Sequence, residues 1–295
     1  MTIARQPQPL EHNSMAPFAE RLHLSTHSNP VKLVVKNSQH EGWLTLEAAV
    51  SEALSVTPTQ LLEFNGWSRG GVKACVGYGE PALIRLEVPL DGDADSDTGL
   101  NVAPVIDTMI ARMIARIENG VADLISGTLE DPDALAVSVS VFVDKAPDIA
   151  SLCEESAWPC QLREPNRWMV TLETAPLFTQ AEVTIQGDEV LIKTSLTEWF
   201  SESQVTNSAI SRLLLAANAH LRMAYSASMP TDAFGSHRAE LVVRFNVANA
   251  ATYLSHSLAS LSLGIRMLQR EIEALLCPEI ASCFLAMTGG DSVAK

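Results

Sequence analysis

Two five-residue stretches decide the fold of this chain: Leu61-Leu62-Glu63-Phe64-Asn65 in the first half and Leu214-Leu215-Ala216-Ala217-Asn218 in the second. Both have the form Leu-Leu-x-x-Asn. Each is followed by two alternating apolar segments, which are typical of strands, and then by a long amphipathic segment, which is typical of a helix. The expected strands are 72–79 and 82–90 in the first half, and 221–229 and 239–247 in the second. The sequence therefore predicts the order helix, strand, strand, helix twice.

Length and composition agree with two similar units. The chain has 295 residues, of which 47% are apolar and 19% charged, so each half is long and apolar enough to build a core. Residues 127–133 combine Gly, Pro and acids between two periodic segments, which favours a boundary there. We predict an α+β fold in which each unit is an antiparallel sheet with a long C-terminal helix across it, the two units being related by an approximate two-fold. The predicted parts are a mobile tail over 1–30, units over 31–130 and 131–285, and a C-terminal tail over 286–295.

The net charge limits the partners. Thirty-five acidic and 20 basic residues give a formal charge of -15, which disfavours nucleic acid and anionic membranes. The apolar runs are too short to span a membrane, and residues 1–14 lack the apolar core of a secretory signal. Five widely spaced cysteines match no zinc or CxxC spacing, so we expect reduced thiols. We expect a cytoplasmic protein.

Two long helices are expected, one ending each unit. In the last, apolar residues recur at intervals of four and three, with small residues beside them at Ser257, Ser260 and Gly264. This helix is expected to lie across its own sheet, with dimerisation through it as the alternative. The stripe of the first helix is Ile106, Ile110, Met113, Ile117, Val121 and Leu124, and that of the last is Leu254, Leu258, Leu261, Ile265, Leu268, Ile272 and Leu275.

The remaining elements are expected from the same patterns. Thr57 and Pro58 are expected to open the first short helix, and Asn207 or Ser208 to cap the second. A Pro-, Cys- and Glu-rich connector is expected over 147–165. Further strands are predicted at 31–35, 43–47, 135–143, 168–173, 182–186 and 189–196, with a tight turn at 186–188. A second alignment of the halves, which matches Trp43–Glu47 with Trp168–Glu173, leaves the final helix without a counterpart.

The doubled pattern resembles the type III secretion chaperone fold and the related YbjN-like family. Besides the two Leu-Leu-x-x-Asn stretches, the strands over 82–90 and 241–245 carry the resemblance. It implies a small, acidic, cytosolic binding protein, here with both halves of the usual dimer in one chain. It also implies that a partner polypeptide is held on apolar patches and sheet edges. No binding residue of the family maps onto this sequence.

One motif suggests an enzyme. Gly66-Trp67-Ser68-Arg69-Gly70 matches the G-x-S-x-G nucleophile elbow, and Asp232 and His256 follow in the order of a hydrolase triad. The elbow requires a strand before the serine and a helix after it, whereas the pattern here predicts a helix before and a strand after. His220 and His256 fall within apolar helical patterns and are expected in the core. We therefore expect no enzyme and keep a serine hydrolase centred on Ser68 as the alternative.

Neither metals nor cofactors are expected. The loop of Asp91, Asp93, Asp95 and Asp97 lacks the glycine and glutamate of a calcium loop. His23 and His27 have no third ligand on an ordered scaffold. Gly77-Tyr78-Gly79 lacks the third glycine of a dinucleotide loop, since Ala82 occupies that position.

Aromatic residues at element ends are the remaining candidates for a binding site. Trp67, Trp158, Trp199 and Phe200 fall at turns or strand ends, where an exposed ring can anchor a partner. Trp43 and Trp168 begin strands and are expected in the core. The sequence therefore predicts a non-catalytic polypeptide-binding protein, with a structural subunit that associates through its C-terminal helix as a further alternative.

Overall fold

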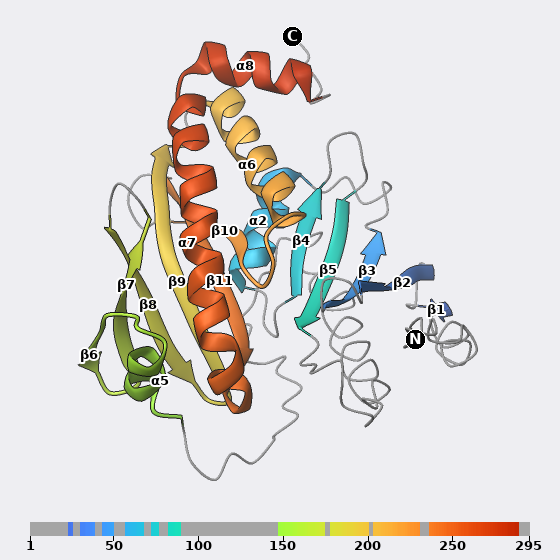
Figure 1. The fold of residues 1–295 in the computed structure, drawn as a ribbon. Helices are drawn as coiled ribbons and strands as arrows, with labels where there is room; N and C mark the ends of the chain where they lie inside the picture. Colours follow the sequence, from blue (N-terminus) through green and yellow to red (C-terminus); the bar gives the residue numbers. More distant parts are fainter. Residues whose placement is uncertain are drawn as a thin grey trace, which may run out of the picture.

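A computed structural model describes ten stretches of the chain: residues 23–25, 30–38, 43–49, 57–67, 72–76, 82–89, 147–174, 178–200, 203–230 and 236–288. Within these stretches the fold is α+β, with two antiparallel sheets and several helices (Figure 1). The first predicted long helix, the predicted strand over 135–143 and the acidic loop over 91–99 lie outside the described residues.

The first sheet has five strands in the order β1-β2-β3-β5-β4. The hairpin predicted between 31–35 and 43–47 is confirmed as β2 and β3, and strands β4 and β5 also form where expected. Strand β1 falls inside the predicted N-terminal tail, where it pairs with β2. The bounds are β1 His23–Ser25, β2 Pro30–Ser38, β3 Trp43–Ala49, β4 Val72–Val76 and β5 Ala82–Pro89.

The second sheet has six strands in the order β10-β11-β9-β8-β7-β6. Its last five strands along the chain, β7 to β11, have the same order as the five strands of the first sheet. In both sheets the strand that follows the Leu-Leu-x-x-Asn helix lies at the edge, and the next strand lies inside it. The bounds are β6 Cys160–Glu164, β7 Arg167–Glu173, β8 Phe178–Gln186, β9 Glu189–Phe200, β10 Tyr225–Pro230 and β11 Ser236–Asn246.

The two Leu-Leu-x-x-Asn helices, α2 (Pro58–Trp67) and α6 (Gln204–Asn218), pack against each other and against the edge strands of both sheets. Thr57 caps α2 as predicted, since the Gln60 backbone N–H donates to its Oγ1 at 3.3 Å. The predicted cap of α6 is wrong. Ser203 has extended backbone and accepts from the Thr206 N–H at 3.3 Å, so α6 begins several residues earlier than expected.

Helix α7 (Ala250–Leu275) lies across the second sheet, as predicted for the last helix (Figure 1). Every residue of its predicted stripe is buried, with at most 4% of the surface exposed. Gly264 allows this close packing, because a Cβ there would stand 2.7 Å from Leu241 Cδ1 on β11. The stripe joins α2, α6 and both sheets in one core.

Three further expectations are corrected. The connector over 147–165 contains helix α5 (Ile149–Glu155), capped by Asp148, and strand β6. Residues 221–224 form a turn with Met223 at a φ of 58°, so β10 starts later than the alternation suggested. His220 and His256 are exposed rather than in the core. His220 follows the C-terminal end of α6, and His256 lies on the solvent-facing side of α7.

The end of the chain carries one more element. Helix α8 (Pro278–Met287) follows α7 after a short break and packs against α6 and α7. Pro278 stands in its first turn, where a missing N–H costs no hydrogen bond. The tight turn predicted at 186–188 is confirmed, with Gly187 at a φ of 62°.

Candidate functional site

The asparagines of the two Leu-Leu-x-x-Asn stretches meet between the sheets. Asn65 donates its side-chain amide to the carbonyls of Ala74 and Ser226 at 3.2 and 2.9 Å, and Asn218 donates to the same carbonyls at 3.0 and 3.2 Å. The Ala74 N–H donates to Asn65 Oδ1 and the Ser226 N–H to Asn218 Oδ1, both at 2.6 Å. Both asparagines are fully buried. These bonds join strand β4 of the first sheet to strand β10 of the second.

A row of charged side chains crosses the first sheet beside these asparagines. Glu47 on β3, Arg85 on β5 and Lys73 on β4 stand at directly opposed positions, so all three share one face of the sheet. Glu87 lies two residues further along β5 on the same face. Glu47 and Lys73 are only 5% and 1% exposed, so this polar face is buried against the rest of the chain.

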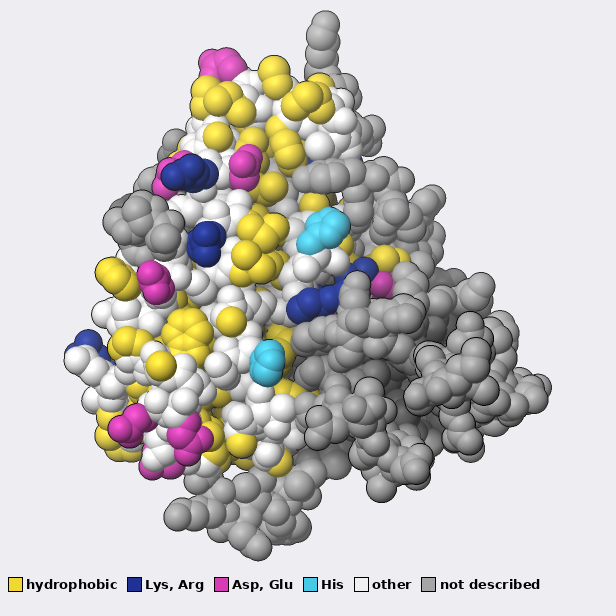
Figure 2. All heavy atoms as spheres, viewed as in Figure 1, with side chains coloured by type: hydrophobic (Ala, Val, Ile, Leu, Met, Phe, Trp, Pro, Cys, Tyr) yellow, Lys and Arg dark blue, Asp and Glu magenta, His cyan; other side chains and the backbone are white. Residues whose placement is uncertain are grey.

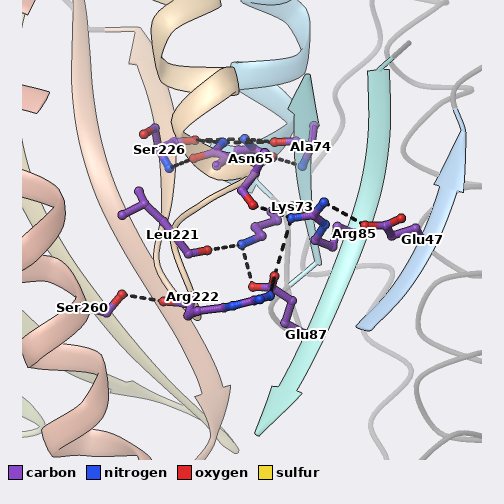
Figure 3. A network of polar contacts seen from close by, with 12 residues as sticks. Glu47, Asn65, Lys73, Ala74, Arg85, Glu87, Leu221, Arg222, Ser226 and Ser260 are labelled. Carbon is purple, nitrogen blue, oxygen red and sulfur yellow. Dashed lines mark hydrogen bonds and ion pairs between the residues drawn. The ribbon is translucent and has the colours of Figure 1, made fainter. Parts of the chain in front are cut away.

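These charges form a connected network, drawn in Figure 3. Lys73 Nζ lies 2.7 Å from Glu87 Oε2, and Arg222 Nη1 lies 2.8 Å from Glu87 Oε1. Arg85 pairs with Glu47 at 2.7 Å and lies 3.7 Å from Glu87. Glu87 therefore accepts hydrogen bonds from Lys73 and Arg222 and forms a longer ion pair with Arg85, while its own side chain is only 2% exposed. We call Glu47, Lys73, Arg85, Glu87 and Arg222 the junction network.

The junction network also holds the turn that follows α6. Lys73 donates to the Leu221 carbonyl at 2.6 Å, and Arg85 donates to the Ala219 carbonyl at 2.7 Å. On the other side of the turn, Ser260 of α7 donates to the Arg222 carbonyl (Figure 3). The turn therefore packs against the small residues that lie beside the α7 stripe. Because these side chains are small, the turn can lie close to the helix.

Burial shifts the pKa of ionisable groups in and beside the junction network. Burial lowers the pKa of Lys73, and the nearby charge of Glu87 only partly opposes this shift. Burial also raises the pKa of the neighbouring Cys75 thiol. Lys73 Nζ is held by the Glu87 carboxylate and the Leu221 carbonyl, and a buried thiol is a poor nucleophile. The network therefore joins the first sheet to the turn that follows α6.

The described residues hold no group of three or more side chains with metal-ligating chemistry. Within the same stretches, no helix is both long and apolar enough to cross a bilayer.

Exposed apolar side chains occur along the two C-terminal helices. Leu263 and Met267, one turn apart on α7, are 54% and 48% exposed. Yellow side chains run along this part of the molecule in Figure 2. We call the following residues the α7–α8 surface: Leu263, Met267, Leu276, Ile280 and Met287. The sequence signal for it was present in apolar residues of the last helix that lie off the predicted stripe, and it was missed because the stripe alone was followed.

The predicted partner-binding aromatics lie on different elements. Trp67 is the last residue of α2, while Trp199 and Phe200 end β9 opposite His237 and Ser236; their side chains lie outside the described residues. Trp158 is partly buried against the core, and its indole N–H donates to Ser255 Oγ of α7 at 3.2 Å. That bond anchors the segment between α5 and β6. The binding role of these four residues stays a prediction.

The residues of the enzyme alternative are only partly described. Ser68 and Asp232 lie outside the described residues. His256 is exposed on α7, with Nδ1 3.1 Å from the Thr252 carbonyl. Helix α2 precedes the Gly-x-Ser-x-Gly motif and strand β4 follows it, which is the reverse of the order that a nucleophile elbow requires.

Comparison with known proteins finds a likeness among solved structures. Among solved structures, the chain is similar to YbjN from E. coli, described as a proposed transcription regulator. The two are 12% identical, the match covers 43% of this chain and 95% of that chain, and the TM-score is 0.33. This likeness concerns the fold of part of the chain. No protein-family model and no curated protein matches the sequence.

Proposed function

We propose that this protein is a non-catalytic, chaperone-like binder of polypeptides, and that the α7–α8 surface receives the partner. One observation carries the proposal: of the seven large apolar side chains that stand out as exposed in the described stretches, four lie on these two consecutive helices and a fifth, Leu276, lies between them. Exposed apolar patches on soluble proteins are typical of interaction sites. The remaining two, Leu162 and Phe178, lie apart from it on β6 and β8.

The chemistry of the surface suits a peptide segment. Methionine side chains such as Met267 and Met287 are flexible and adapt to different partners. Leu263 and Met267 are spaced by four residues, the spacing at which helix-forming partners present their own apolar side chains. Exposed Arg266, Arg270 and Glu273 supply a polar rim. We expect the partner to be an amphipathic segment that lays its apolar side along α7.

The doubled architecture supports a chaperone-like origin for this binder. The shared strand order and the matching bonds of Asn65 and Asn218 fit one chain supplying two related units. A covalent link between such units makes their association intramolecular, at effective concentrations of about millimolar. In this proposal the junction network holds the units together, which leaves α7 and α8 available for a partner in the cytoplasm.

A displayed library of random peptides tests the proposal. Wild-type protein should enrich apolar, helix-forming peptides, and the double variant Met267→Lys with Ile280→Lys should lose them. Leu162→Lys is the matched control, because it adds a charge at a side chain that is 64% exposed on β6. Enrichment of no peptide by the wild type, or equal enrichment by the double variant, would count against the proposal.

The same surface favours one second candidate, a subunit that assembles through its C-terminal helices. Light scattering separates the two candidates. Self-assembly predicts a wild-type mass of two or more chains that falls to one chain in the Met267→Lys, Ile280→Lys variant. Peptide binding predicts no change of mass between them. A fluorophosphonate probe addresses the enzyme alternative, which requires that Ser68 be labelled.

A further inference from the structure

Cys153 and Cys160 form a thiol pair outside the surfaces described so far. Cys153 lies on α5 and is fully buried, while Cys160 is the first residue of β6 and is partly exposed. The two thiols lie close enough for each to shift the pKa of the other. This pairing has no signature in the sequence, since six residues separate the two cysteines and no CxxC spacing occurs.

The backbone between the two cysteines holds them together. The Trp158 N–H donates to the Cys153 carbonyl at 2.8 Å, which closes the chain back on α5. Ala157 takes a φ of 59°, so the reversal occurs within one tight turn. The Thr171 N–H then donates to the Pro159 carbonyl at 2.9 Å, which fixes the start of β6 on β7. Both cysteines are thereby held on fixed backbone.

We propose that Cys153 and Cys160 are an oxidative modification site that closes into an intrachain disulfide in the presence of a small-molecule disulfide such as glutathione disulfide. The exposure of the two thiols decides which of them reacts first with the oxidant. The partly exposed Cys160 thiolate attacks one sulfur of glutathione disulfide, which forms a mixed disulfide and releases one glutathione. Cys153, after losing its proton to solvent, then attacks the Cys160 sulfur and releases the second glutathione. Two protein thiols are oxidised and one glutathione disulfide is reduced to two thiols.

The protonation of the pair fits a site that stays reduced until such an oxidant is abundant. Burial raises the pKa of Cys153 to about 12, and contact with Cys160 adds to this. Burial also raises the pKa of Cys160, although its bond with Cys153 acts in the opposite direction. Both are thiols at neutral pH, so attack on the oxidant is slow, whereas the second step is favoured because the two sulfurs are already in contact.

Mass spectrometry of the full chain tests the proposal. After incubation with millimolar glutathione disulfide and digestion without reductant, the wild type should give a peptide in which Cys153 and Cys160 are joined, with the loss of two hydrogen atoms. Cys153→Ser should instead accumulate glutathione on Cys160. Cys160→Ser should leave Cys153 unmodified, because Cys153 is buried.

The control variant is Cys277→Ser with Cys283→Ser, which removes the two cysteines near α8 and should leave the cross-link unchanged. A wild-type protein that keeps glutathione on Cys160 without closing the disulfide would overturn the proposal. So would a cross-link that joins other cysteines, or no reaction at Cys160. The wild-type measurement decides by itself if a serine variant fails to fold.

Discussion

Asn65 and Asn218 donate their side-chain amides to the same two backbone carbonyls, those of Ala74 and Ser226. Each asparagine also accepts from the N–H of the edge strand that follows its own helix. Each side-chain amide nitrogen of the pair thus donates two hydrogen bonds, and each amide oxygen accepts one. Both side chains are fully buried. The two helices and the two edge strands are fixed to each other by this single set of bonds.

The first prediction concerns these asparagines. Asn218→Ala should lower the free energy of unfolding by about 2–4 kcal/mol, because it removes three hydrogen bonds and leaves the buried Ser226 N–H without its acceptor. Asn65→Ala should cost a similar amount. The double variant should cost less than the sum, since the two share acceptors. Urea unfolding measures this. Asn249→Ala is the control, because this exposed asparagine makes no side-chain cap bond.

A second prediction addresses the centre of the junction network. Glu87→Gln should destabilise the fold by about 3–5 kcal/mol, because it leaves buried Lys73 without its compensating charge. Burial already lowers the pKa of Lys73 below 10.5, so stability should rise with pH between the folded-state pKa and 10.5. The deficit of the variant should therefore shrink as pH rises.

Its control is a pair at the surface. Glu164→Gln removes the partner of Arg167 at 3.5 Å, where both side chains are largely exposed. This change should alter the free energy of unfolding by less than about 1 kcal/mol. An equal loss in both variants would show that burial of Glu87 is not the cause.

The third prediction is a dependence on pH. Burial raises the pKa of Glu240 above 4.5, although Lys193 and Arg238 act in the opposite direction. The folded state then holds this proton more tightly than the unfolded chain, so stability is lost as pH rises from 4.5 through the folded-state pKa. Glu240→Gln should therefore be more stable than the wild type at neutral pH, and the gain should vanish below pH 4.5. Thermal unfolding at several pH values measures it.

Glu182, on the same sheet, has a pKa shift of the opposite sign. Burial acts to raise its pKa, but the hydrogen bond from Arg167 and the charge of Lys193 lower it below 4.5. Its stabilisation is present above 4.5 and is lost as pH falls through the folded-state pKa. Glu182→Gln should therefore destabilise the protein at neutral pH. If both glutamine variants moved in the same direction, the assignment of these environments would be wrong.

The fourth prediction concerns the contact of α7 with β11. Gly264→Ala gains about 1 kcal/mol of helix propensity. However, the new Cβ would lie 2.7 Å from Leu241 Cδ1, which is fully buried. We expect a net loss, growing to about 1–3 kcal/mol or more for Gly264→Leu. Leu241→Val combined with Gly264→Ala should recover part of it. Ala259→Leu, at an exposed position of the same helix, should stay within about 0.5 kcal/mol.

Much of the fold followed from local patterns. The interval of four and three residues from Leu254 to Leu275 predicted α7 and its buried side, and the tight turn at Gly187 was also found. Such features depend on residues near one another in the chain. The elements of the connector were missed because short helices and strands have too few residues for a clear period.

The candidate surfaces were harder to predict. Leu263 and Met267 were visible as apolar residues off the stripe, but only their position on an uncovered side of α7 makes them a surface. The pairing of Cys153 with Cys160 depends on the turn at Ala157, which has no signature in the sequence.

The sequence by itself determined where α7 and most of the described strands form, and that Leu-Leu-x-x-Asn occurs twice, because periodicity and propensity act over a few residues. Only the tertiary structure decided that the charged side of the first sheet is buried and that the two asparagines meet. Alternating polar residues such as Lys73 and Arg85 have the pattern of a strand with one side in water. They are buried instead because the turn after α6 covers them, and Lys73 reaches a carbonyl 148 positions away. A contact of that range depends on how the whole chain packs, which no local pattern specifies.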